Sequence, residues 1–434
     1  MSTMLRETIA QGLDQVRARS LALLDPLPEE AQTRQHSKLM SPVAWDLAHV
    51  GNYEEIWLLR DIGFAGVRPD LDTIYNAFAT PRAERERLPM LGPVDARAYI
   101  ADVRGRVLDT LERVSFDHED RKLREGFLYG MIVQHEHMHD ETMLATLQLM
   151  DGEGYAPYHE PTLRPAGGLV APTEVLVDVG GSFVMGTDDE PWAYDNERAA
   201  HERELAPFFL DTTPVTNGAY LAFLGDGGYD DPRHWDTDGW KWRQKADLVA
   251  PQFWERTSDG WTVVRFGRRE PLRLDEPVQH VCYWEADAYA RWAGKRLPTE
   301  AEWEAAASWG PATRTTRRYP WGDEEPTAAR ANLGQRQWGP APVGAYQAGA
   351  TPGGIHQMLG DVWEWTSSDF QPYPGYMAFP YAEYSEVFYG PKVKVLRGGS
   401  WATAPVAIRN TFRNWDFPIR RQIFSGFRCA RDAV

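Results

Sequence analysis

The sequence predicts a protein of two domains, a helical bundle followed by an irregular mixed α/β domain. Its 434 residues are more than one ordinary hydrophobic core accommodates. Up to about residue 150 apolar side chains recur at helical spacing, whereas later segments are short, rich in Trp and Tyr, and broken by Gly and Pro. We therefore expect a bundle over residues 1–152, a linker over 153–172 and a second domain over 173–434.

Four helices are expected in the first domain, at roughly 4–24, 41–60, 94–115 and 123–150. Ser41 and Pro42 have the character of an N-cap and a first turn, so the second helix should begin there. One stripe of this helix should face the bundle interior. Its members are Trp45, His49, Asn52, Ile56 and Leu59.

The fourth helix carries a similar stripe at alternating spacings of four and three. Its members are Leu128, Ile132, His135, His139, Thr142, Thr146 and Leu149. His137 lies about 200° around the helix from His135. We therefore expect His135 and His139, but not His137, to point into the bundle.

Residues 135–139 read "HEHMH" and fit H-E-x-x-H, the signature of zinc proteases. A protease would also need Glu136 to be aimed at a metal-bound water. The extended form of the motif has Gly and a third His where this chain has Thr142 and Ala145. With His49 from another helix, His135 and His139 instead predict a three-histidine metal site that keeps open coordination positions.

Composition excludes several classes of partner and compartment. The 46 basic and 63 acidic side chains give a formal charge of −17 without a long basic run, which disfavours nucleic acid and anionic membranes. Cys282 and Cys429 are the only cysteines, so a disulfide framework is excluded. No stretch has the character of a signal peptide or a membrane span, and a cytoplasmic protein is expected.

Several segments together carry a family resemblance. "WDLAHVGNYEEIWLLR", "PRAER", "QHEHMHDETM" and "FRNWDFPIRRQIFSGFRCARD" resemble the iron-dependent sulfoxide synthases of ergothioneine biosynthesis, also called hercynine oxygenases. The N-terminal half is similar to a DinB-type four-helix bundle. Through "RLPTEAEWE", "YPWGDE", "MLGDVWEWTSS" and "VLRGGSW", the C-terminal half resembles the formylglycine-generating-enzyme fold, which is related to C-type lectins. The resemblance covers nearly the whole chain.

The resemblance implies a non-haem Fe(II) held by His49, His135 and His139. Members of the family use O₂ to join the sulfur of a thiol to imidazole C2 of hercynine, which is Nα-trimethylhistidine, and they produce a sulfoxide. Members with the most similar tail use γ-glutamylcysteine as the thiol. Open positions on the iron would bring the reactants into one coordination sphere.

The same resemblance assigns roles to residues of the second domain and of the "PRAER" loop. Tyr381 matches a tyrosine that acts as a proton donor or redox-coupled acid, and Tyr384 matches a neighbouring pocket tyrosine. Trp415, with Asn414 beside it, would hold the trimethylammonium of hercynine against an aromatic face. The anionic thiol would be bound by a charged set. Its members are Arg82, Arg85, Asp416 and Arg420. Taken alone, each of these residues is an ordinary packed aromatic or a surface charge. Together they predict an active site between the two domains.

The chain departs from the family pattern at Met138, a substrate-binding position where relatives have Gln, which alone offers amide hydrogen bonds. Cys282 and Cys429 do not match the reactive cysteine pair of formylglycine-generating enzymes, so that activity is not expected. Three alternatives remain: a related oxygenase that uses cysteine or a selenosugar, a zinc-dependent DinB-like thiol transferase, and a non-catalytic binding protein. The sequence assigns no oligomeric state and no calcium ligands.

Overall fold

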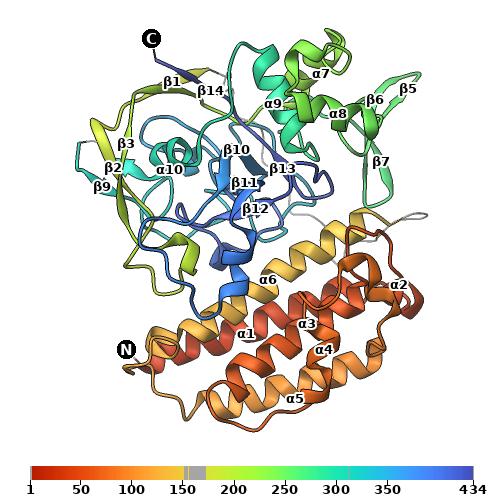
Figure 1. Cartoon of the computed structure of the whole chain (residues 1–434), viewed down its shortest axis with the longest axis vertical. Helices are drawn as coiled ribbons and strands as arrows, with labels where there is room; N and C mark the ends of the chain where they lie inside the picture. Colours follow the sequence, from red (N-terminus) through yellow and green to blue (C-terminus); the bar gives the residue numbers. More distant parts are fainter. Residues whose placement is uncertain (1, 151–154, 156–172, 311, 434) are drawn as a thin grey trace. The chain divides into compact units, whose positions relative to one another are not determined.

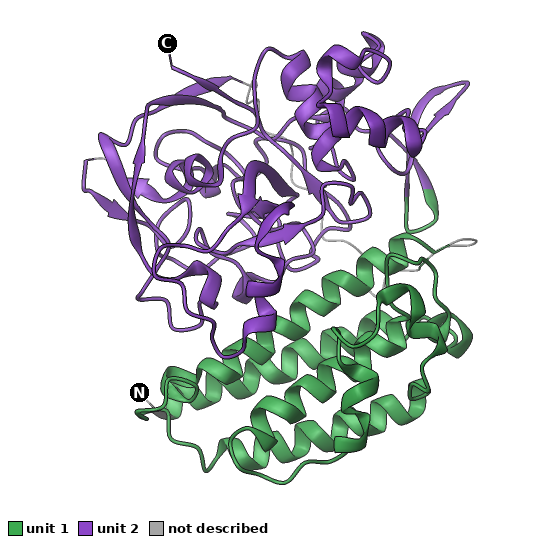
Figure 2. Ribbon diagram, in the orientation of Figure 1, with its two compact units in different colours: residues 1–160, 265–268 green, residues 161–264, 269–434 purple. Residues whose placement is uncertain are grey.

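The structure is a computed structural model that describes residues 2–150, 155, 173–310 and 312–433 (Figure 1). The chain forms two compact units, unit 1 with residues 1–160 and 265–268 and unit 2 with residues 161–264 and 269–434 (Figure 2). The predicted linker lies outside the described residues except for Tyr155, whose backbone N–H donates to the Phe266 carbonyl at 3.1 Å within unit 1. No helix in the described part of the chain is long and apolar enough to cross a membrane.

Unit 1 is a bundle whose long helices correspond to the four that the sequence predicts (Figure 1). They are α1 (Ser2–Leu24), α3 (Val43–Glu55), α5 (Pro93–Leu111) and α6 (Phe127–Gln148). A π-helical turn, Ile56–Arg60, prolongs α3. The shorter helices of the unit are α2 (Glu29–Thr33), α4 (Asp72–Tyr75) and the 3₁₀ segments Pro69–Leu71, Arg82–Arg87 and Arg124–Gly126.

Helix α3 begins one residue later than the sequence predicts. Pro42, not Ser41, is the N-cap residue, and the Pro42 carbonyl accepts the Trp45 backbone N–H at 2.9 Å. The Ser41 hydroxyl instead accepts a hydrogen bond from Arg85 Nη1 at 2.8 Å. The N-cap prediction was wrong because a distant guanidinium occupies the oxygen that would have capped the helix.

A buried ring of charges joins the four long helices, and each helix contributes one member. Arg17 of α1 and Arg104 of α5 alternate with Glu54 of α3 and Glu136 of α6. The four ion pairs have N–O distances between 2.5 and 3.0 Å, and no side chain of the ring is more than 8% exposed. Because an unpaired buried charge is costly, the ring favours the one helix arrangement in which every charge has a partner.

Unit 2 is an irregular mixed α/β domain, as the sequence predicts, built around small sheets (Figure 1). The four-stranded sheet has the order β12 (Asn414–Asp416), β11 (Gly390–Arg397), β10 (Trp363–Phe370), β13 (Ser425–Gly426). A three-stranded sheet has the order β1 (Glu174–Val177), β4 (Phe208–Asp211), β14 (Ala430–Asp432). The other strands are β2 (Gly181–Met185) with β3 (His201–Leu205), β5 (Trp254–Thr257) with β6 (Gly260–Arg265) and β7 (Arg268–Pro271), and β8 (Trp309–Gly310) with β9 (Thr315–Thr316). The helices are α7 (Asn217–Gly225), α8 (Thr237–Lys245), α9 (Tyr283–Trp292) and α10 (Glu300–Ser308).

The motif "RLPTEAEWE" forms the start of α10 and fixes the end of the four-stranded sheet. Thr299 and Glu302 make a capping box in which each side chain accepts the other residue's backbone N–H. On the buried side of α10, Glu300 pairs with Arg413 at 2.7 Å and with Arg397 at 2.9 Å. Since Arg413 directly precedes β12, these pairs hold the strand on which the predicted substrate residues lie.

Candidate metal centre and aromatic pocket

Three histidines of the bundle lie together. His49 on α3 and His135 and His139 on α6 each offer one ring nitrogen, and these nitrogens all lie within 4.8 Å of one another. Among the residues that the structure describes, these histidines are the one group of at least three His, Cys, Asp or Glu side chains that could hold a metal ion. The four-residue spacing places His135 and His139 on one face of α6, as expected from helix geometry. The structure thus brings together the three residues that the sequence singles out.

Hydrogen bonds determine which ring nitrogen faces the centre of this group. His49 Nδ1 donates to the Tyr75 carbonyl oxygen at 2.7 Å, and His139 Nδ1 donates to Asp46 Oδ1 at 3.0 Å. A backbone carbonyl and a carboxylate oxygen act as hydrogen-bond acceptors, so each ring carries its hydrogen on Nδ1 and keeps the Nε2 lone pair available. Such outer contacts orient histidine ligands in metalloproteins.

Two of the three histidines have lowered pKa values, which favours the neutral form that metal binding requires. Burial, together with the neighbouring His139, lowers the pKa of His49 well below its ordinary value. Burial, followed by His139 and His49, lowers the pKa of His135 in the same direction. His49 and His135 are therefore neutral imidazoles at neutral pH. Three imidazole nitrogens suit a first-row transition metal, so the donor set fits the iron that the resemblance implies.

Aromatic rings hold two of the histidine planes. Tyr53 stacks on His135 with the ring centroids 3.9 Å apart and the planes at 21°. Trp45 stacks on His49 at 4.8 Å and 11°. No motif in the sequence marks Tyr53, Asp46 or the Tyr75 carbonyl. The available signal was helical spacing, because Asp46 lies three residues before His49 and Tyr53 lies four residues after it.

Glu136 does not face the histidine group. Its carboxylate accepts hydrogen bonds from Arg17 Nε at 2.7 Å, from Arg104 Nη2 at 3.0 Å and from the Ser20 hydroxyl at 3.0 Å. Burial opposes ionisation, but the two guanidinium groups lower the pKa of Glu136 to about 2. The carboxylate is therefore a charged member of the helix-joining ring, and the zinc-protease interpretation of "HEHMH" is wrong. His137 also lies apart, with Nδ1 3.2 Å from Asp140 Oδ2.

The "PRAER" loop places its two predicted substrate residues differently. Arg82 is exposed. Arg85 is only 4% exposed and donates to the Ser41 hydroxyl, to the Ala77 carbonyl at 2.7 Å and to the Thr80 carbonyl at 3.1 Å. Met138 is partly buried and directly precedes His139 on α6. Near this loop, Asp46 Oδ2 is buried and has no hydrogen-bond partner among the described residues, so one carboxylate oxygen is left for a polar ligand atom or water.

In unit 2, the predicted aromatic residues form one cluster. Tyr384 stacks on Tyr194 at 4.2 Å and meets Trp415 edge-on at 5.7 Å. Tyr381 lies 6.4 Å from Tyr384, and Trp415 stacks on Phe370 at 4.3 Å and 10°. Burial, then the neighbouring Tyr194 and Tyr381, raises the pKa of Tyr384 well above its ordinary value, so this phenol keeps its proton. Tyr194 was missed by sequence analysis because nothing local marks it.

Strand β12 and the turn after it carry the predicted polar residues. Asn414 Oδ1 accepts the Trp415 backbone N–H at 2.8 Å, and Asp416 Oδ1 lies 3.3 Å from Arg420 Nε. Arg420 Nη1 is buried and finds no hydrogen-bond partner in the part of the chain that the structure describes. A buried guanidinium nitrogen of this kind is ready for an acceptor, and a carboxylate suits it best.

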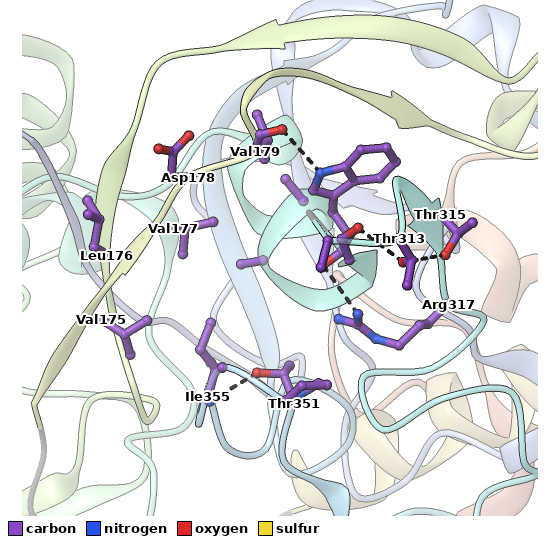
Figure 3. Close-up of a pocket in the computed structure, with 17 residues that line it drawn as sticks. Val175, Leu176, Val177, Asp178, Val179, Thr313, Thr315, Arg317, Thr351 and Ile355 are labelled. Carbon is purple, nitrogen blue, oxygen red and sulfur yellow. Dashed lines mark hydrogen bonds between the residues drawn. The ribbon is translucent and has the colours of Figure 1, made fainter.

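A separate cavity of about 660 Å³ lies in unit 2 beside β1 and α10 (Figure 3). Its wall is mostly aliphatic, with Val175, Val177 and Ile355 among the lining residues. The guanidinium of Arg317 is engaged by backbone carbonyls, including that of Trp309. No histidine or tyrosine lines the cavity. Its size alone therefore does not make it the candidate catalytic site.

Comparisons with known proteins agree with this division of the chain. Residues 12–143 match the DinB superfamily, and residues 162–433 match the sulfatase-modifying factor enzyme 1-like domain. Hercynine oxygenase of Mycolicibacterium smegmatis is 50% identical over 437 residues, which cover 98% of this chain and 99% of the relative. The chain belongs to the hercynine oxygenase family. Hercynine oxygenase of Mycobacterium tuberculosis is also 50% identical, with 98% of this chain and 99% of the relative covered.

Membership of this family confirms the resemblance found in the sequence and makes the protein an enzyme of the oxygenase class. The expected fold class, a DinB-type helical domain followed by a formylglycine-generating-enzyme-like domain, is confirmed as well. The formylglycine-generating enzyme of Streptomyces coelicolor is 36% identical but covers 58% of this chain. That likeness is therefore partial, whereas the hercynine oxygenases match both domains.

Proposed function

We propose that this protein is a non-haem Fe(II)- and O₂-dependent sulfoxide synthase that joins the sulfur of γ-glutamylcysteine to imidazole C2 of hercynine. The convergence of His49, His135 and His139 on one point carries the proposal, together with relatives named hercynine oxygenase. When bound there, iron would supply the activation of O₂ and a binding position for the thiolate. A thiol, an imidazole C–H and O₂ give a sulfoxide with a new C–S bond and one water, so the reaction balances without another reductant.

The protein's own residues hold in a fixed orientation the histidine rings that would bind the metal. The Tyr75 carbonyl accepts a hydrogen bond from His49 Nδ1, and Asp46 accepts one from His139 Nδ1. Nε2 of each ring is therefore left to bind the metal. Three protein ligands leave room for small molecules, as catalytic sites require. A structural metal in a non-catalytic protein would normally have four protein ligands.

Residues of unit 2 are assigned to hercynine. A permanent trimethylammonium group is bound best by an aromatic face, and Trp415 offers one within the aromatic cluster. Asn414 and Tyr384 supply polar groups beside it. Met138 replaces the glutamine of the family pattern, so hercynine loses one amide contact at this position.

The charged residues are assigned to the thiol substrate. γ-Glutamylcysteine carries carboxylates and an ammonium group, which match arginine and aspartate respectively. The unpartnered Nη1 of Arg420 supports this assignment, because it lacks the acceptor that a carboxylate would provide. Arg82 and Arg85 are the further carboxylate contacts, and Asp416 receives the ammonium.

Tyr381 is assigned as the donor of a proton that the reduction of O₂ consumes. A phenol donates a proton readily when a neighbouring group holds it in place, and Tyr384 lies beside it in the cluster. Since the pKa of Tyr384 is raised by burial, Tyr384 acts as a hydrogen-bond donor and not as a base.

The test is a reaction of the full chain, reconstituted with Fe(II), with hercynine, γ-glutamylcysteine and O₂. Oxygen uptake and product mass are followed together, and we expect a product that contains both substrates and one oxygen atom. A parallel reaction with cysteine identifies the thiol donor. Zinc-loaded protein that transfers a thiol without O₂ would overturn the proposal.

The metal site is tested by a matched pair of variants on one helix. His135→Ala should lose stoichiometric Fe(II) and all turnover, because it removes one of three ligands. His137→Ala should retain iron, since this ring contacts Asp140 and not the histidine group. Metal content is measured after dialysis, and iron retained by His135→Ala would reject the ligand assignment.

A further inference from the structure

Three planar groups lie in a stack that ends at a histidine of the metal centre. The Arg85 guanidinium lies over the Trp45 ring, with its central carbon 3.8 Å from the ring centroid. The other member of the stack is His49, whose ring is 4.8 Å from that of Trp45 and tilted by 11°. Arg85 and the proposed metal ligand His49 therefore both pack on the ring of Trp45.

Each layer of the stack is also held at its edge. Arg85 donates to the Ser41 hydroxyl and to the carbonyls of Ala77 and Thr80. Trp45 Nε1 donates to the Ile74 carbonyl at 2.9 Å, and His49 Nδ1 donates to the adjacent Tyr75 carbonyl at 2.7 Å. Each of the three planar groups is held both by packing against its neighbour and by at least one hydrogen bond at its edge. None of them can tilt without losing a contact.

The choice of arginine has a physical reason. A guanidinium is planar and can cover an indole face while its edge donates to several acceptors, whereas an ammonium is a compact, strongly hydrated charge. Arg85 is 4% exposed, so its charge has lost most of its water. The π face of Trp45 and the surrounding oxygen atoms replace that solvation.

We propose that Arg85 is a positioning residue for the metal ligand His49 and acts through Trp45. The inference rests on the metal site of the proposed function. It is distinct from the thiol contact assigned to the same arginine, because it concerns the protein before any substrate binds. Outer contacts of metal-bound histidines commonly change metal affinity by 10- to 100-fold when they are removed.

The experiment measures Co(II) binding to the full chain in the absence of both substrates. Co(II) is chosen because its visible absorption bands report ligand geometry, and a competing chelator gives its affinity. Arg85→Met should weaken Co(II) binding about tenfold and shift the bands. Arg87→Met is the matched control, since Arg87 is exposed and belongs to the same 3₁₀ segment, and it should leave both readouts unchanged.

A second pair of variants tests the intermediate layer. Trp45→Phe keeps an aromatic face between Arg85 and His49, so its Co(II) bands should remain close to those of the native protein. Trp45→Leu removes that face and should reproduce the shift of Arg85→Met. If Arg85→Met fails to fold, Arg85→Lys replaces it, because lysine keeps the charge but not the planar guanidinium face, and it should shift the bands in the same way.

Two results would overturn the proposal. Arg85→Met with native Co(II) affinity and spectrum, but a raised KM for the thiol, would assign Arg85 to substrate binding alone. Identical spectra for Trp45→Phe and Trp45→Leu would exclude transmission through the indole. Failure of the proposed function is distinguishable from both, because the Fe(II) reaction with hercynine, γ-glutamylcysteine and O₂ would then give no product while the native chain still binds Co(II) at the three histidines.

Discussion

Glu136 and His135 are neighbours in the sequence, and their side chains have different surroundings. His135 lies with the other two histidines, whereas Glu136 belongs to a ring of charges contributed by the four long helices. The two roles use different faces of α6, since adjacent helical residues are about 100° apart. At the scale of single residues, the role of a side chain therefore depends less on its place in a sequence motif than on the side chains that surround it.

The role of Glu136 predicts a loss of stability without a loss of metal. Glu136→Gln would leave Arg17 and Arg104 short of a counter-charge, and breaking a buried pair typically costs about 3–5 kcal/mol. Urea unfolding followed by tryptophan fluorescence measures the change, and metal content after dialysis should stay native. Exposed Glu112→Gln is the control and should change stability by less than about 0.5 kcal/mol. Loss of metal from Glu136→Gln would contradict the structural role.

Asp416 predicts a selective effect on one substrate. Its carboxylate lies 3.3 Å from Arg420 Nε and is assigned to the ammonium group of the thiol. Asp416→Asn should raise the KM for γ-glutamylcysteine about tenfold or more, because a charge-assisted contact is lost. The KM for hercynine should stay within about twofold and serves as the internal control. Equal increases for both substrates would reject the assignment.

At the scale of elements, helix α3 supplies more of the candidate metal site than its one proposed ligand. Trp45 stacks on His49 of the same helix, and Asp46 holds His139 of α6. Helix α4 provides hydrogen-bond acceptors for two of these rings. The Ile74 carbonyl accepts a hydrogen bond from Trp45, and the Tyr75 carbonyl accepts one from His49. The short helix α4 therefore fixes the orientation of two α3 side chains through its backbone carbonyls.

Asp46 tests this view of α3. Asp46→Ala removes the acceptor for His139 Nδ1 and should weaken metal binding by about 10- to 100-fold. Asp46→Asn keeps an acceptor oxygen of lower basicity and should therefore lose less. Chelator competition with Fe(II) under anaerobic conditions measures both constants. Native affinity in the alanine variant would show that His139 does not depend on this contact.

At the scale of the whole molecule, the chain combines two units with different principles of construction. Unit 1 joins long helices through a buried ring of charges, whereas unit 2 holds short strands with buried pairs such as Glu300 with Arg413 and Glu364 with Arg428. The three histidines all belong to unit 1. Metal binding should consequently stabilise one unit before the other.

Metal removal tests this separation. A ligand at 100 times its Kd stabilises the state that binds it by about 2.7 kcal/mol. Chelation should therefore raise hydrogen exchange in peptides from α3 and α6, while peptides from α10 and β10 keep their native protection. Exchange is followed by mass spectrometry of the full chain with and without Fe(II). Equal loss of protection in all four elements would contradict a metal effect confined to unit 1.

The sequence by itself determined the helical bundle, the order of the two domains and the shared face of His135 and His139. These features follow from local periodicity, because a helix repeats every 3.6 residues whatever surrounds it. The family motifs indicated which residues to propose as metal and substrate contacts, without showing what surrounds them. Even so, the start of α3 was predicted incorrectly, since the partner that occupies the Ser41 hydroxyl lies 44 residues away.

Only the tertiary structure decided what surrounds each of these side chains. The partners of Glu136 lie 119 residues away at Arg17 and 32 residues away at Arg104, so no local pattern records them. The stack of Arg85, Trp45 and His49 likewise joins a loop to a helix that precedes it by many residues. Periodicity reports which face of a helix is buried, but burial partners are chosen by how the chain folds back on itself.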